Sequence, residues 1–131
     1  MRSRKSIVAR LDKEFSLYIR QRDAVNGTAT CFTCGKQDQW QNMDCGHFMS
    51  RKHYATRWHE DNCQVQCKSC NVFRYGEQFK FGVNLNQIKD GLAEDLLAKS
   101  RELTKFSNSE LLELIEYYKQ KNKEKTLSLQ S

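Results

Sequence analysis

Apolar residues in the first part of the chain recur at the spacing of an amphipathic helix. Between residues 5 and 24 they are separated by three or four positions, which gives a helix one apolar face: Ile7, Val8, Leu11, Phe15, Tyr18 and Ile19. Asn26 and Gly27 follow, and this pair is typical of the end of a helix. The pattern therefore predicts an N-terminal amphipathic helix.

A second helical pattern fills the part of the chain after Cys70. Apolar residues at helical spacing lead up to Gly91: Phe73, Phe79, Phe81, Val83, Leu85 and Ile88. The sequences LAEDLLAKSREL and SNSELLELIEYYKQK then predict two further helices, the last with an apolar face of Leu111, Leu114, Ile115 and Tyr118. Ser107 and Glu110, three residues apart, predict a capping box at the start of that last helix.

Composition indicates an intracellular protein. Hydrophobic residues make up 38% of the chain and charged residues 29%, which is typical of a globular domain. No apolar run approaches the roughly 18 residues of a membrane span. The N-terminal sequence MRSRKSIVARLDKEF has charges where a signal peptide needs its apolar segment. We therefore expect a soluble cytoplasmic protein without membrane contact.

Four of the six cysteines form two Cys-x-x-Cys pairs, which could bind a metal, form disulfides or make a redox centre. A reducing cytosol favours metal, and neither pair lies in the βαβ pattern of a redox motif. Each two-residue gap lets a tight turn present two sulfurs to one tetrahedral ion. We therefore expect a structural Zn²⁺ on Cys31, Cys34, Cys67 and Cys70. Cys45 and Cys63 would be small buried apolar residues.

Residues 28–67 lack a helical period and are rich in Cys, Gly, Asp, Asn and aromatic residues. This region predicts short strands and loops, with a hairpin, organised by the metal. No repeat or linker divides the chain, so residues 1–131 are expected to form one α+β domain. Its parts would be an N-terminal helix at 1–27, a zinc-clipped core at 28–76, C-terminal helices at 77–125 and a tail at 126–131.

Basic residues exceed acidic ones by 22 to 16, for a net charge of +6. Such an excess is often only a solvated surface, so its distribution matters more than its sum. The central region carries a concentration of basic side chains: Arg51, Lys52, Arg57, Lys68, Arg74 and Lys80. Because basic side chains neutralise phosphates, nucleic acid is a candidate partner.

Asp44, His47, Asn62 and Asn71 lie within the segment between the two cysteine pairs or directly after it. Each has an ordinary structural explanation when taken alone, as a hydrogen-bonded histidine, a turn former or a helix cap. Their attachment to one zinc scaffold favours a functional site instead.

This arrangement resembles the HNH endonucleases, the ββα-metal nuclease family, in the variant whose last motif residue is asparagine. His47, Asn62 and Asn71 fall in the three motif positions. The chain is more closely similar to the NinG (Rap) family of lambda-like phages, recombination nucleases that cut branched DNA. The similarity runs from about residue 5 to residue 122 through CFTCG, DCGHF, RWHEDN and QCKSCN. It implies a ββα-metal (HNH) core at 28–76 and a bacterial or phage-infected host cell as the location.

The resemblance also implies a function and the residues that perform it. The protein would be a metal-dependent endonuclease that hydrolyses phosphodiester bonds in Holliday junctions and D-loops. His47 would act as the general base, and Asn71 would give its carbonyl oxygen to Mg²⁺ or Mn²⁺. Asn62 would fix the loop of His47 through hydrogen bonds.

The acidic metal ligand departs from the family pattern. Many relatives carry Asp directly before the catalytic histidine, whereas this chain has Gly46 there. We expect Asp44 to be the ligand. In a plain strand Asp44 and His47 would point to opposite faces, so joint action would need a β-bulge at Cys45 and Gly46. Glu60 and His59 are the substitutes if Asp44 does not reach the ion.

DNA contacts and assembly are expected by the same analogy. Lys68 and Arg74 flank Asn71, and three further basic residues lie between the halves of the motif and could hold flanking phosphates: Arg51, Lys52 and Arg57. The two-fold character of branched DNA favours a homodimer, with the terminal helices as its interface. Two other functions stay open, namely an HNH nicking or restriction-type enzyme on duplex DNA, and a non-catalytic zinc module that binds DNA or protein.

Overall fold

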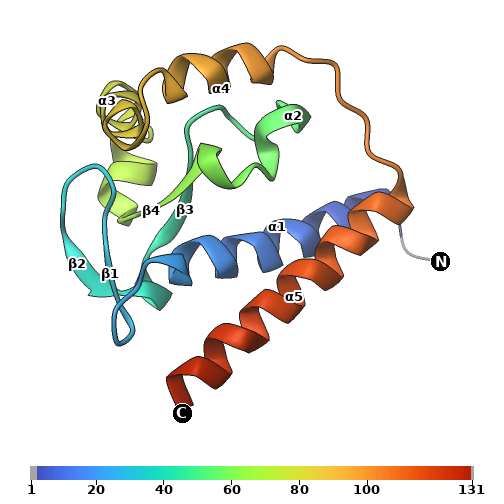
Figure 1. The fold of residues 1–131 in the computed structure, drawn as a ribbon, viewed down its shortest axis with the longest axis horizontal. Coiled ribbons are helices and arrows are strands. Elements are labelled where there is room, and N and C mark those ends of the chain that lie inside the picture. Colours follow the sequence, from blue (N-terminus) through green and yellow to red (C-terminus); the bar gives the residue numbers. More distant parts are fainter. Residues whose placement is uncertain (1–2, 131) are drawn as a thin grey trace.

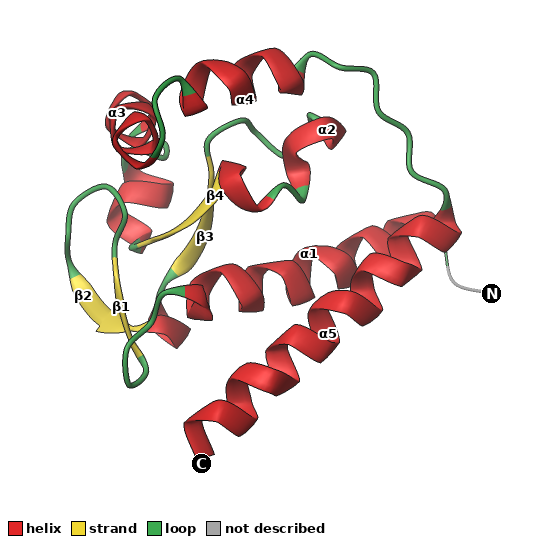
Figure 2. Ribbon diagram, in the orientation of Figure 1, coloured by secondary structure: helices red, strands yellow, loops and turns green. Residues whose placement is uncertain are grey.

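The computed structural model describes residues 3–130, and for residues 128–130 the course of the helix only. Met1, Arg2 and Ser131 lie outside the described residues. The fold is α+β, as predicted, with helices around two short antiparallel hairpins (Figure 2). In chain order the elements are α1 (Arg4–Arg22), β1 (Thr28–Thr30), β2 (Gln37–Gln39), η1 (Trp40–Asn42), β3 (Asp44–His47), α2 (Tyr54–Arg57), η2 (Glu60–Asn62), β4 (Cys63–Gln66), η3 (Ser69–Phe73), α3 (Gln78–Ile88), α4 (Leu92–Ser100) and α5 (Asn108–Gln130).

Helices α1 and α5 start at the same end of the molecule and run side by side in the same direction (Figure 1). Arg4 Nη1 donates a hydrogen bond of 2.9 Å to Asn108 Oδ1 at that end, and Lys125 Nζ donates one of 3.1 Å to the backbone oxygen of Arg22 at the other. Their facing apolar side chains form one core: Ile7, Leu11, Phe15, Ile19, Leu111, Ile115 and Tyr118. The periodic apolar faces predicted from the sequence are therefore intramolecular core.

The apolar faces on which the expected dimer interface was based are buried against each other, with Leu111 0% and Ile115 1% exposed. A homodimer through the terminal helices stays a prediction, which would have to use other side chains of these helices. Helix α5 also continues through residues 126–130, where a tail was expected. Its start is as predicted: Ser107 and Glu110 exchange hydrogen bonds of 3.0 and 3.1 Å in a capping box.

The β3–β4 hairpin lies beside α1 and carries Asp44 and His47. Strand β1 pairs with β2, and β3 pairs with β4, both antiparallel. The β3–β4 ladder is regular from Asp44 opposite Gln66 to His47 opposite Cys63. Because side chains alternate along a strand, Cys45 and His47 share the face toward α1, and Asp44 lies on the opposite face.

Helices α3 and α4 lie on the side of the β3–β4 hairpin that faces away from α1 and α5 (Figure 1). They enclose a separate core of Phe81, Leu85, Leu92, Ala93 and Leu96, against which Phe32 and Phe48 pack. The predicted helical run from Phe73 to Ile88 is interrupted, because the π-helical η3 ends at Phe73 and α3 begins only at Gln78. As a result Phe73 and Phe79 are 77% and 87% exposed, and do not join the core.

Candidate active site

The four paired cysteines come together in a cluster that is compatible with a structural zinc ion. Their sulfur atoms all lie within 4.8 Å of one another, and Cys34 Sγ is 3.7 Å from Cys67 Sγ. Four sulfurs at about 2.3 Å from a tetrahedral zinc ion would be about 3.8 Å apart, whereas a disulfide bond is about 2.05 Å long. Cys31, Cys67 and Cys70 are at most 4% exposed and pack with Ala29, Met43 and Val65.

The thiols of this cluster differ in acidity. Burial and the neighbouring thiols raise the pKa of Cys70 to about 12, whereas hydrogen bonds outweigh burial at Cys31 and lower its pKa to about 6. A zinc ion would deprotonate all four ligands. The donor set and the spacing fit zinc.

Asn71 follows the last of these cysteines and reaches Asp44. Its backbone N–H donates to the backbone oxygen of Cys67 at 2.9 Å, which fixes the turn after the cysteine pair. Its side-chain Nδ2 donates to Asp44 Oδ2 at 3.1 Å, and Lys68 Nζ lies 2.7 Å from Asp44 Oδ1. Two of the predicted site residues, Asp44 and Asn71, are therefore in direct contact.

The β-bulge that would bring Asp44 and His47 to one face is absent, because Cys45 and Gly46 pair in register with β4, so these two side chains point to opposite faces. A different feature explains the glycine. A side chain at position 46 would collide with the Gln66 side chain, which fills that place. Gln66 Nε2 donates to Thr33 Oγ1 at 3.0 Å and to the backbone oxygen of Gly76 at 2.9 Å. Gln66 thus ties β4 to the loop before α3, and position 46 has no room for an aspartate.

The two substitute ligands point elsewhere. Glu60 accepts hydrogen bonds from the hydroxyls of Tyr18 and Tyr118, at 3.2 and 3.0 Å, on the side of α1 and α5. His59 Nδ1 accepts from the backbone N–H of Asp61 at 3.2 Å. Asp44 lies on the face of β3 opposite His47 and, like these two residues, does not line the cleft described below. Its contact with the Asn71 side chain is what joins Asp44 to the predicted site.

His47 is held by a backbone carbonyl. Its Nε2 lies 3.0 Å from the backbone oxygen of Arg57. A carbonyl oxygen only accepts, so Nε2 carries the proton of the neutral ring and Nδ1 has the free lone pair. Burial lowers the pKa of His47 below its usual value, and the hydrogen bond to Arg57 opposes this shift only in part. The ring is therefore neutral at pH 7, with Nδ1 as its basic atom.

Asn62 is fully buried and closes the loop that follows His47. Its Oδ1 accepts from the backbone N–H of Met49 at 2.8 Å, and its Nδ2 donates to the backbone oxygens of Met49 and Thr56 at 3.0 and 3.1 Å. These contacts cross from η2 to the end of β3. They are of the kind expected for a residue that fixes the His47 loop.

One cleft of about 480 Å³ brings together residues from distant parts of the chain. His47 and Asn71 both line it, so the predicted base and the predicted ligand face the same space. The remaining lining residues come from α1, from β3 and the loop after it, and from the turn that leads into α3: Asp12, Phe15, Ser16, Cys45, Ser50, Arg51, Tyr75, Gly76 and Gln78. Sequence reasoning placed none of the α1 residues in the site.

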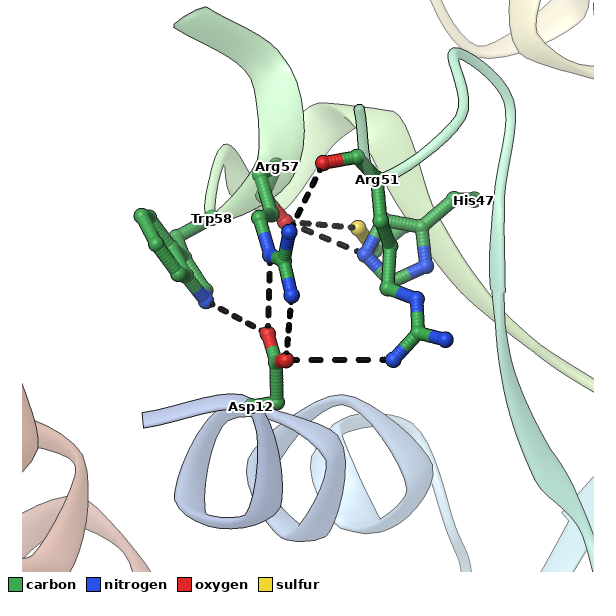
Figure 3. A network of polar contacts seen from close by, with 6 residues as sticks. Asp12, His47, Arg51, Arg57 and Trp58 are labelled. Atoms are coloured by element: carbon green, nitrogen blue, oxygen red, sulfur yellow. Dashed lines mark hydrogen bonds and ion pairs between the residues drawn. The ribbon is translucent and has the colours of Figure 1, made fainter. Parts of the chain in front are cut away.

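Asp12 on α1 organises the wall of this cleft (Figure 3). Its carboxylate accepts from Arg57 Nε and Nη2, at 3.1 and 2.6 Å, and from Trp58 Nε1 at 3.0 Å. Arg51 Nη1 lies 3.8 Å from the same carboxylate. Arg57 in turn supplies the carbonyl oxygen that holds His47. Helix α1 therefore determines the position of the His47 ring through Asp12 and Arg57.

The basic residues predicted to contact DNA fall into two groups. The side chain of Arg57 is only 15% exposed and is engaged by Asp12, so it is less accessible to a phosphate than the others. Lys68 and Arg51 have side chains that are 66% and 63% exposed, although each lies near a carboxylate. Lys52 and Arg74 are exposed as well. Four of the five predicted residues thus remain accessible beside the cleft or the turn of Asn71.

Within residues 3–130, no helix combines the length and apolar character needed to cross a membrane. Comparison with curated proteins and with solved structures gave no match. A family model described as "Bacteriophage Lambda NinG protein" matches residues 1–127. With nearly its whole length matched, and with a four-cysteine cluster and adjoining cleft in place, this chain belongs to the NinG family.

Proposed function

We propose that the protein is a metal-dependent endonuclease that hydrolyses phosphodiester bonds in branched DNA recombination intermediates, such as Holliday junctions and D-loops. The observation that carries the proposal is the cleft in which His47 and Asn71 converge, with Asp44 bonded to Asn71. Membership of a phage lambda family associated with recombination supports the choice of substrate.

His47 is proposed as the general base. A base for water must be unprotonated near neutral pH, and burial keeps the His47 ring neutral there. The hydrogen bond from Nε2 to the Arg57 carbonyl fixes the ring and leaves Nδ1 to take a proton from the attacking water. Asp12 on α1 positions Arg57 and the His47 ring bonded to it, because the Asp12 carboxylate holds the Arg57 side chain.

Asp44 and Asn71 are proposed to hold Mg²⁺ or Mn²⁺. Asp44 Oδ2 and the Asn71 side-chain amide are 3.1 Å apart. Neighbouring ligands of an octahedral ion at 2.0–2.1 Å are about 3 Å apart, so the spacing fits. Rotating the amide by 180° would present its oxygen. A bound divalent ion would offset the negative charge on the phosphate and on the leaving oxygen. The exposed Lys68, Arg51, Lys52 and Arg74 are proposed to hold DNA phosphates.

The zinc cluster is proposed to have a structural role only. Four thiolates complete a tetrahedral shell and leave no position for water or phosphate. Cys67 and Cys70 directly precede Asn71, and Cys31 and Cys34 precede the β3–β4 hairpin that carries His47. A zinc ion in the cluster therefore fixes the spacing between the base and the metal ligands.

Cleavage assays with matched substrates test the proposed function. We expect four-way junctions, D-loops and flaps to be cut in the presence of Mg²⁺ or Mn²⁺, and linear duplex of the same sequence to remain intact. Product strands on denaturing gels measure the result. Equal cutting of linear duplex would favour the nicking or restriction-type alternative. No metal-dependent cutting of any substrate would favour a non-catalytic zinc module.

Sedimentation of the protein with and without a junction tests the expected homodimer.

Substitution of Asp44 tests the metal ligands. Asp44→Asn removes the only carboxylate in contact with Asn71 among the described residues. We expect the Mg²⁺ concentration for half-maximal cleavage to rise at least about tenfold, since weaker changes around metal sites already cost this much. Glu60→Gln is the matched control, because Glu60 contacts tyrosines away from the cleft. An unchanged Mg²⁺ requirement in Asp44→Asn would exclude Asp44 as a ligand.

A further inference from the structure

The segment that follows Asn71 carries an unusual set of exposed apolar side chains. Val72, Phe73, Tyr75 and Phe79 are 55%, 77%, 88% and 87% exposed, although apolar residues of this size are usually buried. They lie on one continuous stretch, residues 72–79, that runs from η3 into the first turn of α3. Tyr75 lines the cleft together with His47 and Asn71. Tyr75 is therefore beside the proposed site of cutting, and Phe73 and Phe79 lie on the same exposed segment, two residues before it and four residues after it.

The backbone beneath these rings is held in an uncommon conformation. Tyr75, Gly76 and Glu77 have φ angles of 54°, 86° and 51°, in the left-handed region that residues other than glycine seldom occupy. The Gly76 N–H donates to the Cys70 backbone oxygen at 2.7 Å, and its own oxygen accepts from the buried Gln66 side chain at 2.9 Å. The loop is thus tied to the cysteine cluster and to β4. Such strain, where the surrounding structure maintains it, is characteristic of functional sites.

Basic side chains alternate with the aromatic ones. Between residues 68 and 80 the chain carries Lys68, Arg74 and Lys80, all exposed, against one acidic residue, Glu77. Exposed aromatic rings interleaved with basic groups are the combination that binds single-stranded nucleic acid. The rings stack on bases, and the cations follow the phosphates. A protein partner would have no need of this charge, and the predicted partner, DNA, is acidic.

We infer that Phe73, Tyr75 and Phe79 form a stacking platform for unpaired or unstacked bases beside the scissile phosphate. In linear duplex every base is already stacked, whereas bases at a branch point or in a single-stranded arm are accessible. The platform would thereby favour branched DNA over duplex at the step of binding. This inference rests on the proposed function for the position of the phosphate, and it names the feature of the substrate that is recognised.

A binding experiment tests the platform separately from catalysis. The experiment uses His47→Ala protein, so that the DNA is expected to stay intact. The probes are a four-way junction with 2-aminopurine at or near the branch, a single-stranded oligonucleotide that contains 2-aminopurine, and linear duplex. Stacking on an aromatic ring quenches 2-aminopurine fluorescence. The variants in this background are Tyr75→Ala and the double variant Phe73→Ala, Phe79→Ala, whose side chains are exposed and contribute little to folding. Leu103→Ala, at 91% exposed on the connection between α4 and α5, is the matched control.

We expect each lost ring to weaken binding of the junction and the single strand by about 5- to 150-fold, and to abolish the change in fluorescence. Phe73→Tyr with Phe79→Tyr should retain both, and Leu103→Ala should match the parent protein. Arg74→Gln should instead reduce the dependence of binding on salt. Alanine variants that bind and quench as the parent does would overturn the inference. The inference would also be overturned if the alanine substitutions changed the association state of the protein but not its DNA binding, because the surface would then be an interface between two copies of the protein. If the native protein cuts no substrate but the platform variants lose binding as expected, the proposed function fails and the platform stands.

Discussion

Replacing Cys67 with serine is expected to release the zinc ion and unfold the centre of the protein. Cys67 is 4% exposed and lies in the core that contains Met43 and Val65, so the change removes a metal ligand from a buried cluster. Zinc binding supplies an apparent free energy of about 10–16 kcal/mol in small zinc domains, which equals or exceeds the total stability of a typical domain, about 5–15 kcal/mol. Few other single substitutions in this chain should have so large an effect.

Zinc content and circular dichroism measure this outcome. The native protein should contain one zinc ion per chain, and Cys67→Ser should contain none and lose its cooperative thermal transition. Cys45→Ala is the matched control, because Cys45 lies on the β3 strand outside the four-cysteine cluster and its loss should leave zinc in place. A Cys67→Ser protein that is folded and still contains stoichiometric zinc would show that the cluster is not the zinc site.

The His47→Ala substitution is expected to remove cleavage while zinc and the fold remain. General-base catalysis contributes about 10²- to 10⁴-fold to a rate, so cutting of a junction under single-turnover conditions should fall by at least about a hundredfold. Junction binding should be retained, since the phosphate contacts proposed above come from other residues. His53→Ala is the control, because His53 is absent from the cleft lining. If the His47→Ala protein lost zinc or failed to fold, His47 would be a structural residue.

The same base predicts the pH dependence of cleavage. Burial lowers the pKa of His47 below 6.5, and only the neutral ring can accept a proton. Activity governed by His47 should therefore be highest above the lowered pKa, where the ring is neutral, and should fall as pH drops through it, with a midpoint below pH 6.5. Measurements of kcat/KM as a function of pH test the assignment. A midpoint above pH 6.5 would indicate that another group limits the reaction.

Features that depend on neighbouring residues could be predicted from the sequence. The capping box of Ser107 and Glu110 requires only residues within one turn, and its hydrogen bonds are present. The spacing of apolar residues predicted α1 and α5, because residues three or four positions apart lie on the same face of a helix. The two Cys-x-x-Cys pairs predicted a four-sulfur cluster because two-residue gaps have one favourable way to present sulfur to an ion.

Errors arose where a contact joined distant parts of the chain. A basic residue looks the same in sequence whether it is exposed or paired, so Arg57 was expected on DNA, and its partner Asp12 lies 45 positions earlier. A bulge at Gly46 was the condition for Asp44 and His47 to act together, whereas the observed constraint there is the Gln66 side chain on the neighbouring strand. Phe73 and Phe79 were placed in one helical run because periodicity alone does not show the turn between η3 and α3.

The helices, the cysteine cluster and the order of the candidate residues could be read from the chain, because those features follow from local geometry and ligand chemistry. Three features required the folded molecule: which helix faces became core, that Asp44 and not Glu60 meets Asn71, and that α1 supports His47 through Asp12 and Arg57. The same structure leaves Tyr75 exposed in the cleft wall and Phe73 and Phe79 exposed on the same segment. The physical reason is that packing, pairing and exposure depend on which distant side chains occupy the same space, and no local pattern encodes that information.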